Sequence, residues 1–413
     1  MRVDRKPSPA LHPLNEFMPF PATRLTGLNA FTSFTAIAVL TLLAACASDA
    51  PRPDPPTNPG LVKISKDWDT YVGFGPSYRD YRYRPAQDDA WVYIAGKQGE
   101  LYRVDKLNGN RETLAVFDRE ITGGVTLVRG SLLFGNIDGE LIAFSLDERK
   151  AHWSVSLGSE VLHPPVSNGA LVAVKTNNGQ LWGVELATGT ILWTTITNNP
   201  PLSTRAKSAP LLAAGLVFSS FDTGKVAIIN PRNGARMWEA AIGETPSRNE
   251  IQRIIDADTS PVLNPPYLYA ANLHGSLRAF KLAANQLPES AWSRDFSTHL
   301  NLALDARHIY AISEQSSLHA FAKDSGEEAW SNTSLKHQGM GAPLLWRDYL
   351  ISAATDGRVY VFNPDNGALL GVRRVSPYAV SSFLLADKER LFVQDDGGYL
   401  HALRIDDHSS EGA

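Results

Sequence analysis

The residue types that most often perform covalent or metal chemistry are scarce in this chain. Its 413 residues include one cysteine, Cys46, and ten scattered histidines. A single cysteine excludes a disulfide framework and a cluster of thiolate metal ligands. The sequence also lacks the Gly-x-Ser-x-Gly, His-Glu-x-x-His and phosphate-loop patterns of common hydrolases, zinc proteases and nucleotide-binding proteins. We therefore predict a protein that is not an enzyme and that carries no metal ion or cofactor.

The position of Cys46 points to a different chemistry, the attachment of lipid. Arg24 precedes a short apolar stretch that ends in small residues, and this pattern predicts a secretory signal over residues 1–45. The stretch is too short to span a bilayer comfortably, which takes about 20 residues. Its end, Leu43-Ala-Ala-Cys46, resembles the lipobox of bacterial lipoproteins. The alternative is an ordinary signal peptide with an incidental cysteine, but the only cysteine stands at the one position that a lipobox requires.

The lipobox resemblance carries further implications for the start of the mature chain. It implies that the chain is cut before Cys46, that this residue is acylated, and that Ala47, in place of an aspartate, directs the protein to the outer membrane, facing the periplasm. Five prolines follow between residues 51 and 59. We expect residues 46–60 to form an extended spacer that is unable to pack, between the lipid and the fold.

Composition supports a packed, non-membrane fold after the spacer. Hydrophobic residues make up 43% of the chain and charged residues 20%, as in ordinary globular proteins. The net charge of −4 at pH 7 provides no basic field, so we expect no nucleic-acid partner.

The residues after the spacer form an internal repeat. Its signature is a turn glycine followed by an alternating strand, and successive copies are 40, 40, 45, 51, 41, 41 and 41 residues apart. The eight copies begin at Gly99, Gly139, Gly179, Gly224, Gly275, Ser316, Gly357 and Gly398. An apolar β-type run precedes each turn, and a second turn follows each strand. Four short strands in about 40 residues make one propeller blade.

The repeat therefore predicts an all-β fold over residues 61–408: an eight-bladed β-propeller of four-stranded antiparallel blades. The last copy lacks a fourth strand, and Leu61-Val-Lys-Ile64 is left over at the other end. Pairing the two would close the ring with an N-terminal strand and remove an exposed edge.

Tryptophans recur near the end of several copies. Three of them stand four residues after a turn glycine, which resembles the docking motif of quinoprotein-type propellers, where an indole fills the gap between neighbouring blades. The expected docking residues are Trp153, Trp193, Trp238, Trp292 and Trp330.

Two specific functions remain open as alternatives for such a propeller. Asp222-Thr-Gly-Lys225 is similar to a pattern of quinoprotein dehydrogenases, so one alternative is a quinone-dependent dehydrogenase. Those enzymes commonly use a vicinal cysteine pair, which this chain cannot supply. The other alternative is a periplasmic polysaccharide-binding propeller, which would expose an aromatic-lined central funnel.

Two irregular spacings, of 45 and 51 residues, mark insertions between the third and fifth copies. They contain Pro201-Leu-Ser-Thr-Arg-Ala-Lys-Ser-Ala-Pro210 and Ile251-Gln-Arg-Ile-Ile-Asp-Ala-Asp-Thr-Ser-Pro261. Loops on a rigid scaffold often carry binding function, so we expect a partner-binding surface here. An arginine and two carboxylates could meet opposite charges on a partner, or pair with one another.

With the lipobox, the spacer and the eight blades, these insertions resemble the BamB family of lipoproteins of the outer-membrane β-barrel assembly machinery. The resemblance implies a scaffold that binds the periplasmic domains of BamA and assists the insertion of β-barrel proteins, with nascent outer-membrane proteins as further partners. It also implies that the contacts come from Leu202, Arg205, Asp256 and Asp258. Thr204 stands where the family has a second leucine, which removes one apolar contact.

Overall fold

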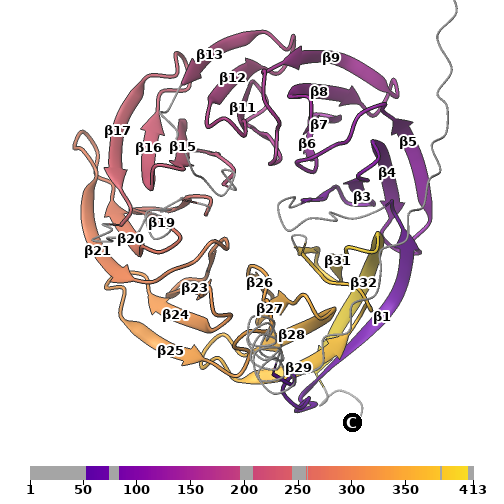
Figure 1. Cartoon of the computed structure of the whole chain (residues 1–413), viewed down its shortest axis with the longest axis vertical. Coiled ribbons are helices and arrows are strands. Elements are labelled where there is room, and N and C mark those ends of the chain that lie inside the picture. The colour runs from indigo at the N-terminus through magenta and orange to yellow at the C-terminus, as the bar shows by residue number, and fades with distance from the viewer. Residues whose placement is uncertain are drawn as a thin grey trace, which may run out of the picture. The chain divides into compact units, whose positions relative to one another are not determined.

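The computed structural model describes residues 53–73, 83–195, 208–243, 257, 259–381 and 384–407. These residues form eight four-stranded antiparallel sheets that follow one another around a ring (Figure 1). The predicted fold class, an eight-bladed β-propeller, is confirmed. In this described part of the chain, no helix is long and apolar enough to cross a membrane.

Each sheet is one blade, and we number the blades in chain order. Blades 1 and 2 consist of β2 (Ala86–Gln87), β3 (Trp91–Ala95), β4 (Glu100–Asp105), β5 (Arg111–Val116), and of β6 (Thr126–Val128), β7 (Ser131–Gly135), β8 (Glu140–Ser145), β9 (Lys150–Ser156). Blades 3 and 4 consist of β10 (Val166–Ser167), β11 (Leu171–Lys175), β12 (Leu181–Glu185), β13 (Ile191–Thr195), and of β14 (Leu211–Ala213), β15 (Leu216–Phe221), β16 (Lys225–Ile229), β17 (Arg236–Ala241).

The second half of the ring repeats this plan. Blades 5 and 6 consist of β18 (Val262–Asn264), β19 (Tyr267–Ala271), β20 (Ser276–Lys281), β21 (Glu289–Asp295), and of β22 (Ala303–Leu304), β23 (His308–Ile312), β24 (Leu318–Ala322), β25 (Glu328–Asn332). Blades 7 and 8 consist of β26 (Leu344–Trp346), β27 (Tyr349–Ala353), β28 (Arg358–Phe362), β29 (Leu369–Arg374), and of β30 (Leu385–Ala386), β31 (Leu391–Gln394), β32 (Tyr399–Asp407), β1 (Val62–Tyr71).

The core lies between blades, because the two middle strands of a blade are covered on both faces. All five residues of β11 are buried, for example, whereas exposed residues dominate the outer strand β9. One apolar cluster joins Leu101 of blade 1 to Phe134 of blade 2, and another joins Val359 of blade 7 to Leu403 of blade 8. Burial of apolar surface between blades therefore stabilises the ring as a whole.

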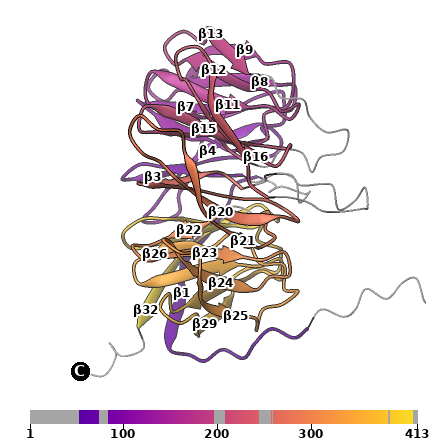
Figure 2. The same cartoon turned by 90° about the vertical axis from the view of Figure 1, so that its left-hand side faces the viewer.

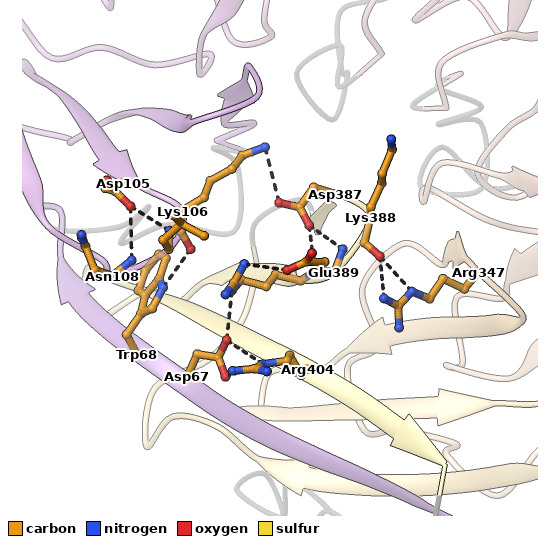
Figure 3. Close-up of polar contacts among 12 residues, drawn as sticks. Asp67, Trp68, Asp105, Lys106, Asn108, Arg347, Asp387, Lys388, Glu389 and Arg404 are labelled. Atoms are coloured by element: carbon orange, nitrogen blue, oxygen red, sulfur yellow. Dashed lines mark hydrogen bonds and ion pairs between the residues drawn. The ribbon is translucent and has the colours of Figure 1, made fainter. Parts of the chain in front are cut away.

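The N-terminal strand closes the ring, as predicted. β1 pairs antiparallel with β32 from Val62 opposite Asp407 to Tyr71 opposite Tyr399. The Asp67 carboxylate accepts hydrogen bonds from Arg404 at 2.7 Å and from Arg390 at 2.9 Å (Figure 3). The first and last strands of the fold therefore share one blade, and charged side chains reinforce their pairing.

Indole rings join neighbouring blades by a repeated geometry. The Trp193 Nε1–H of blade 3 donates to the Pro231 carbonyl of blade 4 at 2.7 Å. The ring lies against Gly234, where a Cβ would come within 2.7 Å of it. In the same way, each of these indoles donates to a carbonyl three residues before a turn glycine of the next blade: Trp153 to Leu186, Trp292 to Lys323 and Trp330 to Pro364. A glycine is needed at each turn because a side chain would occupy the space of the ring.

One expected tryptophan lies differently, and one docking tryptophan was not anticipated. Trp238 packs edge-on against Phe280 of blade 5, with ring centroids 4.9 Å apart. Trp68 of β1 donates to the Lys106 carbonyl at 3.1 Å (Figure 3) and lies against Gly109 of blade 1. It precedes the first repeat in the sequence, so the repeat pattern did not include it, but it docks blade 8 on blade 1.

The described part of the proline-rich spacer contacts the fold, contrary to the expectation that it is unable to pack. The Asn58 Oδ1 accepts a hydrogen bond from the Val372 N–H at 3.1 Å, and the Leu61 N–H donates to the Leu370 carbonyl at 2.9 Å. The Pro53 carbonyl accepts a hydrogen bond from Gln338 at 2.6 Å. Although prolines cannot donate backbone hydrogen bonds, their carbonyls and the intervening Asn58 provide the contacts. Residues 53–61 thus cover the outer edge of blade 7.

Removal of a docking indole should open one junction between blades. We expect Trp193→Ala to lower the free energy of unfolding by about 3–5 kcal/mol, because it removes a large buried ring and leaves a cavity. Urea unfolding followed by circular dichroism measures the loss. Leu192→Ala, at the half-exposed neighbouring position of the same strand, is the matched control and should change stability by less than about 1 kcal/mol. Equal losses in the two variants would contradict the docking role.

The closing blade should also be sensitive to acid through Asp395. Burial alone would raise the pKa of this carboxyl, but hydrogen bonds from His401, Ser376 and the Tyr399 N–H outweigh burial and lower its pKa below the ordinary 3.8. The unfolded chain then binds the proton more tightly than the folded chain. The contribution of Asp395 to stability is therefore complete above the ordinary pKa and is lost as the pH falls through the lower folded-state pKa.

Asp395→Asn should consequently flatten the loss of stability on acidification below pH 3.8, while lowering stability at neutral pH. Urea midpoints measured at a series of pH values test this expectation. Asn178→Ala, at an exposed uncharged residue in the corresponding turn of blade 3, removes no carboxyl and should leave the shape of the pH profile unchanged. A profile of Asp395→Asn that runs parallel to that of the parent protein would refute the linkage.

Candidate partner-binding face

The predicted contact residues Leu202, Arg205, Asp256 and Asp258 lie outside the described residues, as does the predicted anchor Cys46. The structure does describe where the two insertions leave and rejoin the ring. The first leaves after Thr195 of β13 and rejoins at Ser208. The second leaves after Gly243 and rejoins through Ala257 and Thr259. The described residues therefore include the base of both insertions.

Both insertions belong to the same face of the ring. Each links the outer strand of one blade to the inner strand of the next blade. Such links lie beside the turns between second and third strands: the Leu157 N–H donates to the Gly139 carbonyl, and the Ile242 N–H donates to the Gly224 carbonyl. We call this side of the ring the insertion face. The turns between third and fourth strands lie on the opposite face.

One turn of blade 4, taken with the strand residue before it (Ser220–Gly224), holds the bases of both insertions. At the start of the second insertion, the Ile242 N–H donates to the Gly224 carbonyl at 2.9 Å. At its end, the Ala257 N–H approaches the Phe221 carbonyl at 3.4 Å. Ser208, at the end of the first insertion, donates through its hydroxyl to the Ser220 carbonyl at 3.2 Å. Blade 4 is therefore the common support of the two segments.

The returning ends of the insertions are also bonded to each other. The Ala209 N–H, just after the first insertion, donates to the Ser260 hydroxyl, just after the second, at 3.0 Å. The Ser260 N–H in turn donates to the Asn301 side chain of the link to blade 6 at 2.9 Å. The Thr259 hydroxyl donates to the Ala271 carbonyl at 2.5 Å. These bonds fix the separation of the two insertions at their base.

A buried charge pair lies beneath this base. Lys175, at the end of β11 in blade 3, extends into blade 4, where its Nζ donates to the Ser208 hydroxyl at 2.7 Å and to the Ser220 carbonyl at 2.9 Å. The nearest carboxylate oxygen of Asp222 is 3.8 Å from the same Nζ, and both side chains are 1% exposed. Among the described residues, neither oxygen of Asp222 has a hydrogen-bond partner.

Burial of two charges costs several kcal/mol in lost hydration, so this pair is a poor way to gain stability. Its value is positional. The Lys175 ammonium bonds both to Ser208 and to a carbonyl of blade 4. It therefore holds Ser208, the residue at which the first insertion rejoins the ring, in one position. Lys175 was not predicted as a functional residue, although a signal was present: at the corresponding position the other blades have Ala95, Gly135, Ser220, Ala271, Ile312, Ala353 and Gln394, and none of these is charged.

The Asp222-Thr-Gly-Lys225 segment does not assemble a single site. Asp222 is buried opposite Lys175, whereas Lys225 is exposed and pairs with Glu239 at 2.7 Å. Within the described ranges, no group of three or more His, Cys, Asp or Glu side chains could hold a metal ion. The motif is therefore used here as a turn and as a structural charge.

A family model described as outer membrane protein assembly factor BamB matches residues 98–332 and 314–410. The outer membrane protein assembly factor BamB of Yersinia pestis is 26% identical over 380 residues, which cover 88% of this chain and 96% of that protein.

Two solved structures share the fold. The crystal structure of BamB from Moraxella catarrhalis matches with a TM-score of 0.74 and 24% identity over 83% of this chain and all of that one. The quinohemoprotein alcohol dehydrogenase from Comamonas testosteroni matches with a TM-score of 0.67 and 12% identity over 85% of this chain and 78% of that one. At these identities the likeness shows the eight-bladed architecture alone.

The buried pair allows a direct test of how the insertions are supported. Asp222→Leu leaves the Lys175 ammonium buried without a carboxylate and should lower the free energy of unfolding by about 3–5 kcal/mol. The double variant Lys175→Met/Asp222→Leu removes both charges and should recover most of that loss. Urea unfolding of Asp222→Leu, Lys175→Met and the double variant gives the coupling free energy between the two charges. Additive losses would show that the two charges do not act as a pair.

Proposed function

The chain belongs to the family of the outer membrane protein assembly factor BamB, and on that premise we propose that it is a non-catalytic scaffold of the outer-membrane β-barrel assembly machinery. It would bind the periplasmic domains of BamA and assist the assembly and insertion of β-barrel proteins. Membership in this family confirms the predicted resemblance to BamB and the prediction of an assembly factor rather than an enzyme.

One observation carries the proposal for the contact surface: the two insertions rise from a single braced support. Their returning ends are bonded through Ala209 and Ser260, and both are held by the turn of blade 4. Binding to a partner is tighter when less loop freedom is lost. A shared base limits that loss for two loops at once, which supports a joint role in recognition.

The residues within the insertions suit such a contact chemically. Arg205 would form charge-assisted hydrogen bonds with a carboxylate of BamA, and Asp256 and Asp258 would receive donors from it. Leu202 would supply an apolar anchor at the centre of the contact. The four residues are proposed contacts, two in each insertion. They would form one surface because the insertions start from neighbouring blade junctions.

The family associates the chain with assembly at the outer membrane. We propose that acylated Cys46 anchors it there, facing the periplasm. Nascent outer-membrane proteins are proposed as further partners, since an exposed blade edge could pair with an extended strand. The dehydrogenase alternative has little support from the site, because Asp222 and Lys225 lie in different environments.

Substitution within the insertions tests the proposed contact. We expect Arg205→Ala/Asp256→Ala to reduce co-purification of BamA from detergent-solubilised membranes at least about tenfold, since loss of two charge-assisted contacts amounts to more than about 1.4 kcal/mol. Arg232→Ala, at an exposed arginine in the turn between third and fourth strands of blade 4, is the matched control on the opposite face. Undiminished capture of BamA by the folded double variant would exclude these residues as contacts.

A further inference from the structure

Three exposed tyrosines gather on the insertion face at blade 8, far around the ring from the insertions at blade 4. Tyr71 ends β1, Tyr399 begins β32, and Tyr378 lies in the link between blades 7 and 8. Their side chains are 36%, 39% and 51% exposed, respectively. We call these three residues the tyrosine patch. A buried tyrosine contributes to a core, but these three side chains remain partly accessible to solvent.

The blade 8 turn that ends in Gly397 and Gly398 positions the rings. A Cβ on Gly397 would come within 2.2 Å of the Tyr378 ring, and a Cβ on Gly398 within 2.9 Å of the Tyr71 ring. The Tyr71 and Tyr399 rings meet edge to face, with centroids 5.5 Å apart and planes at 67°. Where this turn has Gly397, the other blades have Gln98, Asp138, Asn178, Thr223, His274, Gln315 and Asp356. The glycine pair therefore lets the Tyr378 and Tyr71 rings lie directly on the turn.

The chain that leads from the predicted lipid anchor reaches the fold beside this patch. From Leu61 on the opposite face, residues 53–61 run back across the edge of blade 7 to Gln338 on the insertion face (Figure 2). Gln338 holds the Pro53 carbonyl at 2.6 Å and accepts a hydrogen bond from Thr355 at 3.3 Å. Two residues later in the same turn of blade 7, the Cβ position of Gly357 lies 2.6 Å from the Tyr378 carbonyl. This turn of blade 7 thus connects the tyrosine patch with Pro53, the point at which the fold holds the tether, as we call the chain between Cys46 and Pro53.

The length of the tether then limits the distance to the membrane. Seven peptide units separate Cys46 from Pro53, and an extended chain spans at most about 3.6 Å per residue, so the anchor lies within roughly 25 Å of Pro53 whatever path the chain takes. If Cys46 is acylated, as the proposed function holds, the bilayer surface is within this distance of the insertion face at blade 7.

We propose that the tyrosine patch rests in the headgroup layer of the membrane that holds the lipid anchor. Tyrosine suits that layer because its ring is apolar and its hydroxyl can remain hydrated. The acyl chains supply the affinity, and the patch supplies orientation. It brings the blade 8 side of the insertion face to the bilayer and leaves the insertions, on the other side of the ring, free to meet a protein partner.

Fluorescence of the full acylated protein on vesicles tests the orientation. In Pro377→Cys, an exposed site beside Tyr378, the thiol is labelled with a nitrobenzoxadiazole dye after Cys46 has been acylated. The vesicles contain phosphatidylethanolamine and phosphatidylglycerol at 3:1, with or without a spin label on the headgroup. Leu287→Cys, at a 70% exposed site between the third and fourth strands of blade 5, carries the control label on the opposite face.

We expect the spin label to quench the dye at position 377 and to spare the dye at position 287. Adding Tyr378→Ser and Tyr399→Ser to the Pro377→Cys protein should restore emission while the protein stays with the vesicles. Equal quenching at both positions, or unchanged quenching in the serine variant, overturns the proposal. So does a serine variant that loses co-purification of BamA and keeps its quenching, which would make the patch a protein contact. Protein that fails to float with vesicles at all overturns the lipid anchor and the tether argument with it, an outcome distinct from failure of the patch alone.

Discussion

The structure depends on one pairing, that of β1 with β32. Seven blades are built from consecutive strands, but blade 8 takes its outer strand from the start of the fold. The pairing runs from Val62 to Tyr71 and is reinforced by Asp67 with its two arginines. Without it, blade 8 would expose an unpaired edge and the junction at Trp68 would be lost. The blades contact one another around a closed ring, so the pairing that closes the ring stabilises every contact between blades.

Closure also determines what the insertion face can present. Because the blades are arranged in one closed circle, the bases of the insertions at blade 4 and the tyrosine patch at blade 8 lie on opposite sides of the ring. The Lys175–Asp222 pair and the bond between Ala209 and Ser260 hold the first of these features in place. The glycine pair of blade 8 holds the second.

The period of the repeat made the architecture predictable, because turn glycines and docking indoles satisfy local steric demands that recur every 40 residues. The leftover strand at Leu61 was sufficient to predict closure. The base of the insertions was not predictable, since Lys175 and Ser208 meet only when two blades are side by side. The bond from Gln338 to Pro53 joins residues 285 positions apart, and no local pattern reports such a contact. The five prolines of the spacer predicted an extended chain that is unable to pack, whereas the Pro53 carbonyl and the Asn58 side chain form hydrogen bonds with the fold.

Synthesis order gives the pairing of β1 with β32 a further consequence. The residues of β1 are made among the first of the fold and their partners in β32 among the last, so the ring stays open until β32 has been produced. Contacts so distant in sequence form slowly, and an open ring exposes strand edges that invite aggregation. A chain that crosses a membrane before folding would profit from this delay, because it cannot close prematurely. Synthesis of β32 is then the event that allows the ring to close.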